Sequence, residues 1–552
     1  MQRPSFRLGA LLGGLTALLL IAVSYLGEQL ASLPFIPFNL FDWLARVLPG
    51  NVISLGIDSM VRLITSLGLG PISATAKRLE QLQGLVLVVG IGVVFGVILT
   101  WALRRSTESG AVIGATGGSV VFVLVGAMEL SLGSAIARSP VVAFLWLAVL
   151  TIGWGVLLGL WLDRAPAAST APAAQPEAPR PNESLARRVF FKQLAGLLAA
   201  TFAAWGIGWL LHNQRLPAAT AGRSTPASNI PTTPEIPLTG GQAATPAVAP
   251  AAGAGQAASL VPVPGTRPAL TPIKDFYRID IDTIPPTIDG SSWSLKVSGL
   301  FDRPRQLTLA DVQAYPAVTQ PATMSCISNP VGGDLIGTAY WKGAPLHLVL
   351  ADLGLRPEAK ALNIKAADGY YESLTLEDLQ DPRTLLVYAM NDQPLPADHG
   401  FPLRIYIPDR YGMKQPKWMT SIEAVTERTN GFWVDRGWSL EARPQIVSVI
   451  DRVTAKPENG VVPIGGIAWA GARGITKVEV EVDEGPWAEA VLITPPLGPL
   501  TWVQWRYDWP AAQGTHTFAV RATDGTGTLQ DPRFQDTFPD GATGYDSVTA
   551  TF

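Results

Sequence analysis

The sequence has few of the side chains that hold most metal centres in proteins. Its 552 residues include one cysteine, Cys326, and four histidines. A single cysteine excludes an intrachain disulfide, a zinc cluster and an iron–sulfur site, and the Cys-x-x-Cys-His motif of covalent haem is missing. Any chemistry at Cys326 must therefore use one thiol.

Charged side chains are also scarce. They make up 15% of the residues, against 48% hydrophobic residues, and the formal net charge is -3. This balance lacks the basic excess that electrostatic nucleic-acid binding requires, so we exclude nucleic acid as a partner. The chain is too apolar for an ordinary soluble protein, which predicts that part of it lies in a membrane.

Long apolar runs are concentrated in the first 211 residues. They cover about residues 8–26, 84–103, 111–133, 140–162 and 190–211. Each run is long enough to cross a bilayer core as a helix, so we predict five transmembrane spans. The segment at about 34–70 mixes aromatic and charged residues, such as Trp43 and Arg46, and we interpret it as interfacial or re-entrant.

Arginine residues beside these runs predict the orientation, because positively charged flanks are retained in the cytoplasm. Such residues are Arg3, Arg7, Arg104, Arg105, Arg164, Arg180, Arg187 and Arg188. Their positions agree with a cytoplasmic amino terminus and five crossings. We therefore expect a multi-pass protein of the cell membrane, with everything after residue 211 on the extracytoplasmic side.

Composition divides the chain into four regions. We predict an all-α transmembrane anchor at 1–212, a flexible linker at 213–269, a folded mixed domain at 270–440 and a further domain at 441–552. The linker is dominated by Ala, Pro, Thr and Gly, so it cannot bury a core. In the last region Val478, Val480 and Val482 alternate with charged residues, which predicts an all-β, immunoglobulin-like sandwich.

The residues around Cys326 resemble a known family. Met324-Ser325-Cys326-Ile327-Ser328-Asn329 is followed by Gly332, Gly333, Gly337 and by Ala339-x-Trp341-x-Gly343. This stretch resembles the segment that carries the molybdenum-bound cysteine in the sulfite-oxidase superfamily of molybdopterin oxidoreductases. The stretch from Met390 to Trp418 resembles the family's pterin-pyrophosphate-binding segment, and Phe276-Tyr277-Arg278 resembles the entry to its domain. The likeness covers roughly residues 270–552.

This resemblance implies an α+β sulfite-oxidase-type domain with Mo-molybdopterin as its cofactor. It also implies a carboxy-terminal domain of the dimerisation type, which is compatible with a homodimer. Molybdenum held by a dithiolene accepts a further soft donor, and the Cys326 thiolate is the one candidate in this sequence. The alternative for a lone cysteine is a small buried apolar residue, which is the commoner case without such flanking matches.

The resemblance also implies a set of cofactor-binding residues. An anionic phosphate is held by Arg, Lys, His and backbone N–H groups on a tight loop, such as the turn at 411–416. The candidates are Phe276, Tyr277, Arg278, Asp368, His399, Arg404, Gln415 and Lys417. Asp368 stands just before Gly369, where the family places a polar contact to the pterin.

Two further residues are expected at the reaction centre. Tyr370 aligns with the tyrosine that assists oxo transfer in sulfite-oxidizing members, although its neighbour Tyr371 is an alternative. Those members also carry an arginine shortly after the metal cysteine, where this sequence has Pro330 and Val331. Arg473, from the carboxy-terminal domain, is the candidate that would replace it.

These residues predict two-electron oxygen-atom transfer, with oxidation of sulfite or a related small oxyanion as the first choice. Reduction of a sulfoxide, including protein methionine sulfoxide, is the alternative. A second alternative is a non-catalytic extracytoplasmic binding protein that retains an enzyme scaffold. The sequence leaves the substrate open.

Export and electron transfer complete the prediction. Residues 186–192 resemble a twin-arginine export motif, which suits a cofactor that is inserted before export. The competing interpretation is that Arg187 and Arg188 are ordinary cytoplasmic flanks. His212 is the one histidine that borders a predicted span, so a pair of axial haem ligands is missing there. We therefore expect a separate electron-transfer protein or a quinone as redox partner.

Overall fold

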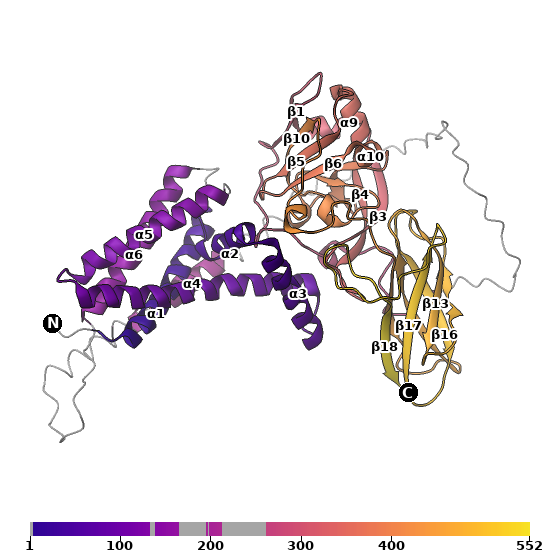
Figure 1. Ribbon diagram of the computed structural model, residues 1–552, viewed down its shortest axis with the longest axis horizontal. Coiled ribbons are helices and arrows are strands. Elements are labelled where there is room, and N and C mark those ends of the chain that lie inside the picture. Colours follow the sequence, from indigo (N-terminus) through magenta and orange to yellow (C-terminus); the bar gives the residue numbers. More distant parts are fainter. Residues whose placement is uncertain (1–3, 133–138, 165–191, 193–194, 197, 212–260) are drawn as a thin grey trace, which may run out of the picture.

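A computed structural model describes residues 4–132, 139–164, 192, 195–196, 198–211 and 261–552 (Figure 1). A helical half lies beside a β-rich half. The helical half contains four helices long and apolar enough to cross a membrane: α1 (Phe6–Ala31), α4 (Ile72–Arg105), α5 (Gly110–Leu132) and α6 (Pro140–Arg164). These helices agree with four of the five predicted spans.

The fifth predicted span is described in part. Its described portion includes a shorter apolar helix, Leu198–Leu211. Residues 186–191, which carry the paired arginines of the export motif, lie outside the described residues, as does most of the predicted linker.

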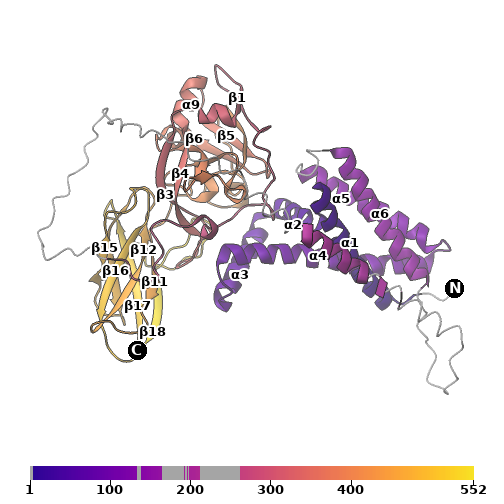
Figure 2. The ribbon, with the colours of Figure 1, turned by 180° about the vertical axis from the view of Figure 1, so that it is seen from behind.

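Two amphipathic helices occupy the segment that we interpreted as interfacial or re-entrant. They are α2 (Ile36–Val47), which has Pro37 in its first turn, and α3 (Gly50–Leu67), which ends at Gly68 in the left-handed conformation. Neither is among the helices apolar and long enough to span a membrane. Figures 1 and 2 both show α3 projecting from the helical bundle beside the β-rich half.

The domain that follows is built on two five-stranded sheets. The first has the order β2-β1-β10-β5-β6, and the second has the order β3-β4-β7-β8 with β9 paired to β7. Only β1 and β10 run parallel among the described strand pairs of these sheets. A buried cluster that includes Leu295, Leu362 and Leu386 fills the main core. This mixture of sheets and short helices agrees with the predicted α+β domain.

The bounds of these elements are β1 (Ser294–Gly299), β2 (Gln306–Thr308), α8 (Leu309–Gln313), β3 (Val318–Ser325), β4 (Ile336–Pro345), α9 (Leu346–Leu353), β5 (Ala361–Ala366), β6 (Tyr371–Thr375), α10 (Leu376–Gln380), β7 (Leu385–Met390), β8 (Gln393–Pro394), β9 (Arg404–Tyr406) and β10 (Met419–Val425).

The carboxy-terminal region forms two four-stranded antiparallel sheets with a shared apolar core. One sheet has the order β11 (Val447–Val453), β12 (Val461–Trp469), β16 (Val503–Pro510), β15 (Val491–Ile493). The other has the order β14 (Ala488–Glu489), β13 (Ile475–Val482), β17 (Thr515–Asp524), β18 (Asp546–Thr551). Val478, Val480, Trp505 and Phe518 are fully buried between the sheets. The predicted alternation along β13 is therefore correct, and the immunoglobulin-like topology stays a prediction.

Close approach of α5 and α6 depends on glycine. At Gly155 an added Cβ would collide with the carbonyl oxygen of Gly114, whereas at Gly153, two residues earlier, it would meet no atom within 4 Å. Small residues at such positions let the backbones of neighbouring membrane helices touch. Gly155 and Gly153 therefore form a matched pair, because a side chain would clash with α5 at Gly155 and would meet no neighbour at Gly153.

We predict that Gly155→Leu separates α5 from α6 and lowers the free energy of unfolding by about 2 kcal/mol or more, because the backbone cannot yield to the new side chain. Gly153→Leu is the control and should change the stability little. Thermal unfolding of the full chain in detergent measures both. Equal melting temperatures for the two variants would contradict this account of the helix contact.

Candidate active site

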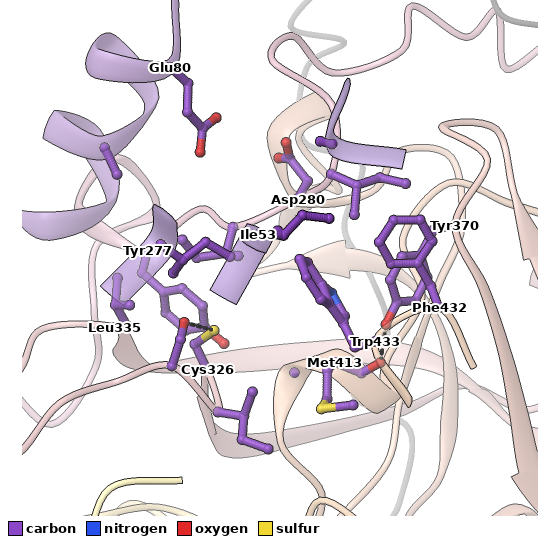
Figure 3. A pocket seen from close by; sticks show the side chains of 18 of the residues that line it. Ile53, Glu80, Tyr277, Asp280, Cys326, Leu335, Tyr370, Met413, Phe432 and Trp433 are labelled. Carbon is purple, nitrogen blue, oxygen red and sulfur yellow. Dashed lines mark hydrogen bonds between the residues drawn. The ribbon is translucent and has the colours of Figure 1, made fainter. Parts of the chain in front are cut away.

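Cys326 directly follows strand β3 and faces a cavity of about 360 Å³ (Figure 3). Its side chain is buried, and Sγ lies 3.0 Å from the hydroxyl oxygen of Ser328. The loop is closed by two hydrogen bonds, in which Cys326 N–H donates to the Leu335 carbonyl and Leu335 N–H donates to the Asn329 side chain. The hairpin between β3 and β4 thus fixes the thiol at the cavity wall.

Arg404, from β9, is a buried cation with incomplete pairing. One guanidinium nitrogen donates to the His399 carbonyl, another lies 3.2 Å from the sulfur of Met324, and Nε has no hydrogen-bond partner among the described atoms. A thioether is a weak acceptor, so the guanidinium is under-satisfied. Burial lowers the pKa of Arg404 to about 10, which still leaves it charged at neutral pH.

Two further basic side chains stand beside Arg404. Burial lowers the pKa of Lys417 to about 8, despite the neighbouring Asp280 carboxylate. Burial, with the added charges of Lys417 and Arg404, lowers the pKa of His399 to about 3, so its imidazole is neutral at neutral pH. All three residues line the cavity that contains Cys326.

Asp280 is the buried anion that joins these cations. Its carboxylate lies 2.7 Å from Arg278, 3.1 Å from Lys417 and 3.1 Å from Lys77 of α4. Burial alone would raise the pKa of Asp280, but Lys417, Lys77 and Arg278 together hold it well below its usual range. Asp280 therefore stays ionised and fixes the basic side chains around it.

These residues fit the molybdopterin cofactor. The unpartnered Arg404 Nε, the adjacent Lys417 and the neutral His399 offer donors to one anionic group, such as a phosphate. The Cys326 thiol, on the same cavity, offers the soft donor that molybdenum takes. When bound, the cofactor supplies two-electron redox chemistry, and the chain supplies orientation and the surrounding charges.

The aromatic candidates form the wall beside the thiol. Figure 3 shows Tyr277 next to Cys326 and Tyr370 farther along the cavity beside Phe432. Phe276 stacks on Tyr277 at 5.4 Å between ring centroids and meets His399 edge-on at the same distance. Burial raises the pKa of Tyr277 well above its usual value, so the phenol stays protonated beside the cysteine.

The remaining candidates are held by local hydrogen bonds. The Tyr370 hydroxyl donates to the Met413 carbonyl at 2.6 Å, and Tyr370 N–H donates to the Asp368 carboxylate at 3.0 Å. Burial and the nearby Asp282 raise the pKa of Asp368 to about 7. The Gln415 amide donates to the Arg410 carbonyl at 2.9 Å, which closes the turn at 411–416.

The cavity thus brings together nine of the predicted residues. They are Phe276, Tyr277, Cys326, Asp368, Tyr370, His399, Arg404, Gln415 and Lys417. Arg278 does not line it and acts on it through Asp280. The individual roles assigned to these residues remain predictions.

Arg473 and Val331 lie elsewhere. The Arg473 guanidinium pairs with Asp524 at 2.8 Å and with Asp409 at 3.4 Å, outside the wall of the Cys326 cavity. Val331 lines a separate small cavity between the Cys326 loop and the carboxy-terminal sheets. The structure therefore places both Arg473, the predicted substrate arginine, and Val331, which stands where sulfite-oxidizing members have an arginine, outside the Cys326 cavity.

Sequence reasoning missed the contribution of the helical half. Side chains of α2, α3 and α4 form one wall of the cavity. Arg46 of α2 pairs with Asp282 at 2.7 Å, and Asp42 accepts a hydrogen bond from Thr283 N–H at 2.8 Å. The mixed composition of residues 34–70 marked the segment as interfacial, but its partner lies more than two hundred residues away in the chain.

Comparison with known proteins agrees with this site. Residues 282–433 match the family described as oxidoreductase molybdopterin binding domain. The chain is 32% identical over 276 residues to sulfite oxidase of Arabidopsis thaliana, which covers 40% of this chain and 70% of that protein. It is 32% identical over 169 residues to the uncharacterized oxidoreductase YuiH of Bacillus subtilis. This match covers 31% of this chain and 83% of that protein.

A third relative is the putative protein-methionine-sulfoxide reductase subunit YedZ1 of Azospira oryzae, 32% identical over 152 residues, with 28% of this chain and 56% of that protein covered. The fold and the site together define a molybdopterin-dependent oxidoreductase. The chain belongs to the sulfite-oxidase superfamily of these enzymes, and its cofactor is a molybdopterin.

We predict that Cys326→Ser lowers turnover by more than about 100-fold, because a hydroxyl is a harder and less acidic donor than a thiol. The control is Ser328→Ala, which removes a hydroxyl that contacts the predicted metal ligand and should lower turnover by no more than about 100-fold. Turnover per bound molybdenum measures both. Near-normal turnover in Cys326→Ser would exclude the thiolate as the metal ligand.

Proposed function

We propose that the chain catalyses two-electron oxygen-atom transfer on a sulfur compound. The observation that carries this proposal is the position of the Cys326 thiol, which faces a cavity that is also lined by the basic residues suited to a pterin phosphate. A sulfoxide would take up two electrons and two protons to give a sulfide and water. Sulfite would combine with water to give sulfate, two electrons and two protons.

An uncharged sulfoxide is the substrate that the geometry favours. Beside Cys326, the wall consists mainly of apolar and aromatic side chains, including Ile327, Leu335 and Tyr277. Within the described residues, Arg404 is the arginine that lines this cavity, and the cofactor phosphate would occupy it. Arg473 is already paired with two carboxylates. This arrangement reverses the order of substrates that the sequence alone suggests.

The sulfoxide is either a free compound or a protein methionine sulfoxide, and helices α2 and α3 supply one wall of the cavity that either would enter. Sulfite oxidation is the second candidate. It is favoured by the activity named for the plant relative.

The two substrate classes make different demands on Arg473. If Arg473 holds sulfite, we expect Arg473→Ala to raise the KM for sulfite about 10-fold to 100-fold, because charge-assisted hydrogen bonds contribute about 1.5–3 kcal/mol. If a neutral sulfoxide is the substrate, as we propose, the KM for dimethyl sulfoxide should change by less than about 10-fold, the effect of 1.4 kcal/mol.

A control separates binding from stability. Arg473→Ala leaves the buried Asp524 carboxylate without its ion-pair partner, although Thr526 and Thr528 still donate hydrogen bonds to it, so Arg473→Ala combined with Asp524→Asn removes that charge as well. Steady-state kcat/KM of the original chain on sulfite and on dimethyl sulfoxide decides between the substrates, and the single and double variants show whether Arg473 contributes. A large rise in the KM for sulfite that persists in the double variant would contradict the sulfoxide proposal.

We also propose that the catalytic domain lies outside the cytoplasm. Helices α2 and α3 lie between α1 and α4, so they are on the side opposite the amino terminus if α1 crosses the membrane. The catalytic domain contacts α2 through Arg46 and Asp282, so it is on that same side. An odd number of crossings is then required, which supports a fifth span at about 190–211 and export of the folded domain.

A β-lactamase fused after Phe552 should therefore give the cells resistance to ampicillin, because this enzyme protects the cell only from outside the cytoplasm and remains active when it is exported folded. The control is the same enzyme fused after Arg105, where two crossings should give no resistance. Cytoplasmic behaviour of the Phe552 fusion would exclude five crossings.

A further inference from the structure

The wall that the helical half gives to the Cys326 cavity is apolar where α2 and α3 form it. The side chains include Leu44, Leu48, Ile53, Ile57 and Met60, and Gly56 leaves a gap among them. The sulfoxide and sulfite groups proposed above as substrates are small and polar and do not require such a surface. The wall is therefore suited to a second, apolar ligand.

The apolar wall continues to the outside of the molecule. Leu48 and Val52 line the cavity and are 39% and 47% exposed. Helix α3 also exposes the large apolar side chains of Leu55, Leu63 and Leu67. An amphipathic helix with exposed apolar side chains is suited to the bilayer surface. In that position the edge of the cavity at Leu48 and Val52 would face lipid.

Polar groups are found where α4 joins the same wall. Glu80 and Gln83 lie on one face of α4 and line the cavity. The Glu80 carboxylate accepts from Lys77 at 2.8 Å, and Lys77 in turn pairs with Asp280. A carboxylate can accept a hydrogen bond from a ligand hydroxyl, and an amide can donate to a ligand carbonyl. The wall thus combines an apolar surface with a hydrogen-bonding end.

The electron carrier has to come close to the cofactor. Iron–sulfur clusters and haem are held by cysteine, histidine or methionine side chains. The whole sequence has one cysteine, Cys326, and four histidines, and His399 is buried in the cavity wall. Among the residues that the structure describes, no group of three or more His, Cys, Asp or Glu side chains could hold a metal ion as a relay between the cofactor and a distant partner.

We propose that the face formed by α2, α3 and the first turns of α4 binds a quinone, a lipid-soluble two-electron carrier with an aromatic head and an aliphatic tail. The tail lies along Leu48, Val52 and Ile53, and the head approaches Glu80 and Gln83. The inference rests on the proposed function, because oxygen-atom transfer requires two electrons. A quinol loses two electrons and two protons and becomes a quinone, and a sulfoxide takes them up and becomes a sulfide and water.

Gly56 offers a way to fill this face without disturbing the fold. An added Cβ at Gly56 meets no atom within 4 Å, and the same holds for Gly90 in α4, which does not line the cavity. Replacement of a helical glycine also raises helix propensity. Gly56→Phe and Gly90→Phe therefore form a pair that differs in whether the new ring enters the cavity.

Binding is tested first, without turnover. The full chain in lipid nanodiscs is irradiated with a decyl-tailed azidoquinone, and the labelled peptides are identified by mass spectrometry. We expect labelling within residues 41–61 or 76–83, competition by unlabelled decylquinone and at least a fivefold lower yield in Gly56→Phe than in Gly90→Phe. Labelling elsewhere, equal yields in the two variants, or equal competition by a decyl-tailed lipid without a quinone head would overturn the proposal.

Electron transfer is tested second. Reduction of dimethyl sulfoxide is followed with decylquinol and, in the same preparation, with a reduced water-soluble viologen dye. In Gly56→Phe the ratio of quinol-linked to dye-linked rate should fall at least tenfold, and in Gly90→Phe it should match the original chain. An unchanged ratio in Gly56→Phe would overturn the quinone site. Absence of dye-linked turnover on both sulfoxide and sulfite would instead reject the proposed function, and the labelling result would still decide the quinone site.

Discussion

The architecture depends on one buried carboxylate, Asp280. It lies between Lys77 of a membrane helix and the pair Arg278 and Lys417 of the molybdopterin domain. One ionised acid holds three cations together in this site, because loss of the carboxylate would leave three neighbouring positive charges without their shared counter-charge. The same carboxylate therefore positions Lys417 for the cofactor and fastens the helical half to the domain.

The cofactor side of the site could be predicted from the sequence. Cys326, His399, Arg404 and Lys417 occur in two stretches that were grouped by their resemblance to the sulfite-oxidase superfamily, and all four line one cavity. Arg473 was a weaker inference, because it comes from another domain and its position depends on how two domains pack. Its ion pairs with Asp409 and Asp524 were not visible in any motif.

In the fold, too, local elements could be predicted from the sequence, whereas contacts between segments far apart in the chain could not. Apolar runs predicted the helices α1, α4, α5 and α6, and alternation of Val478 and Val480 predicted a buried strand. The location of α2 and α3 over the cavity could not be predicted. Their amphipathic pattern indicates that one face is covered, but a periodic pattern does not say which surface covers it. Here it is a domain that begins far along the chain.

Coverage of the cavity by α2 and α3 means that the catalytic unit is not the β-rich half alone. A fragment that begins after the linker would keep Cys326 and the two sheets, yet it would lose a wall of the cavity and the Lys77 partner of Asp280. Helices α2 and α3 would be absent, and water would enter where their side chains now exclude it. The polarity around Cys326 is thus set by two halves of the chain together, and a change in how the helical half packs becomes a variable of the chemistry.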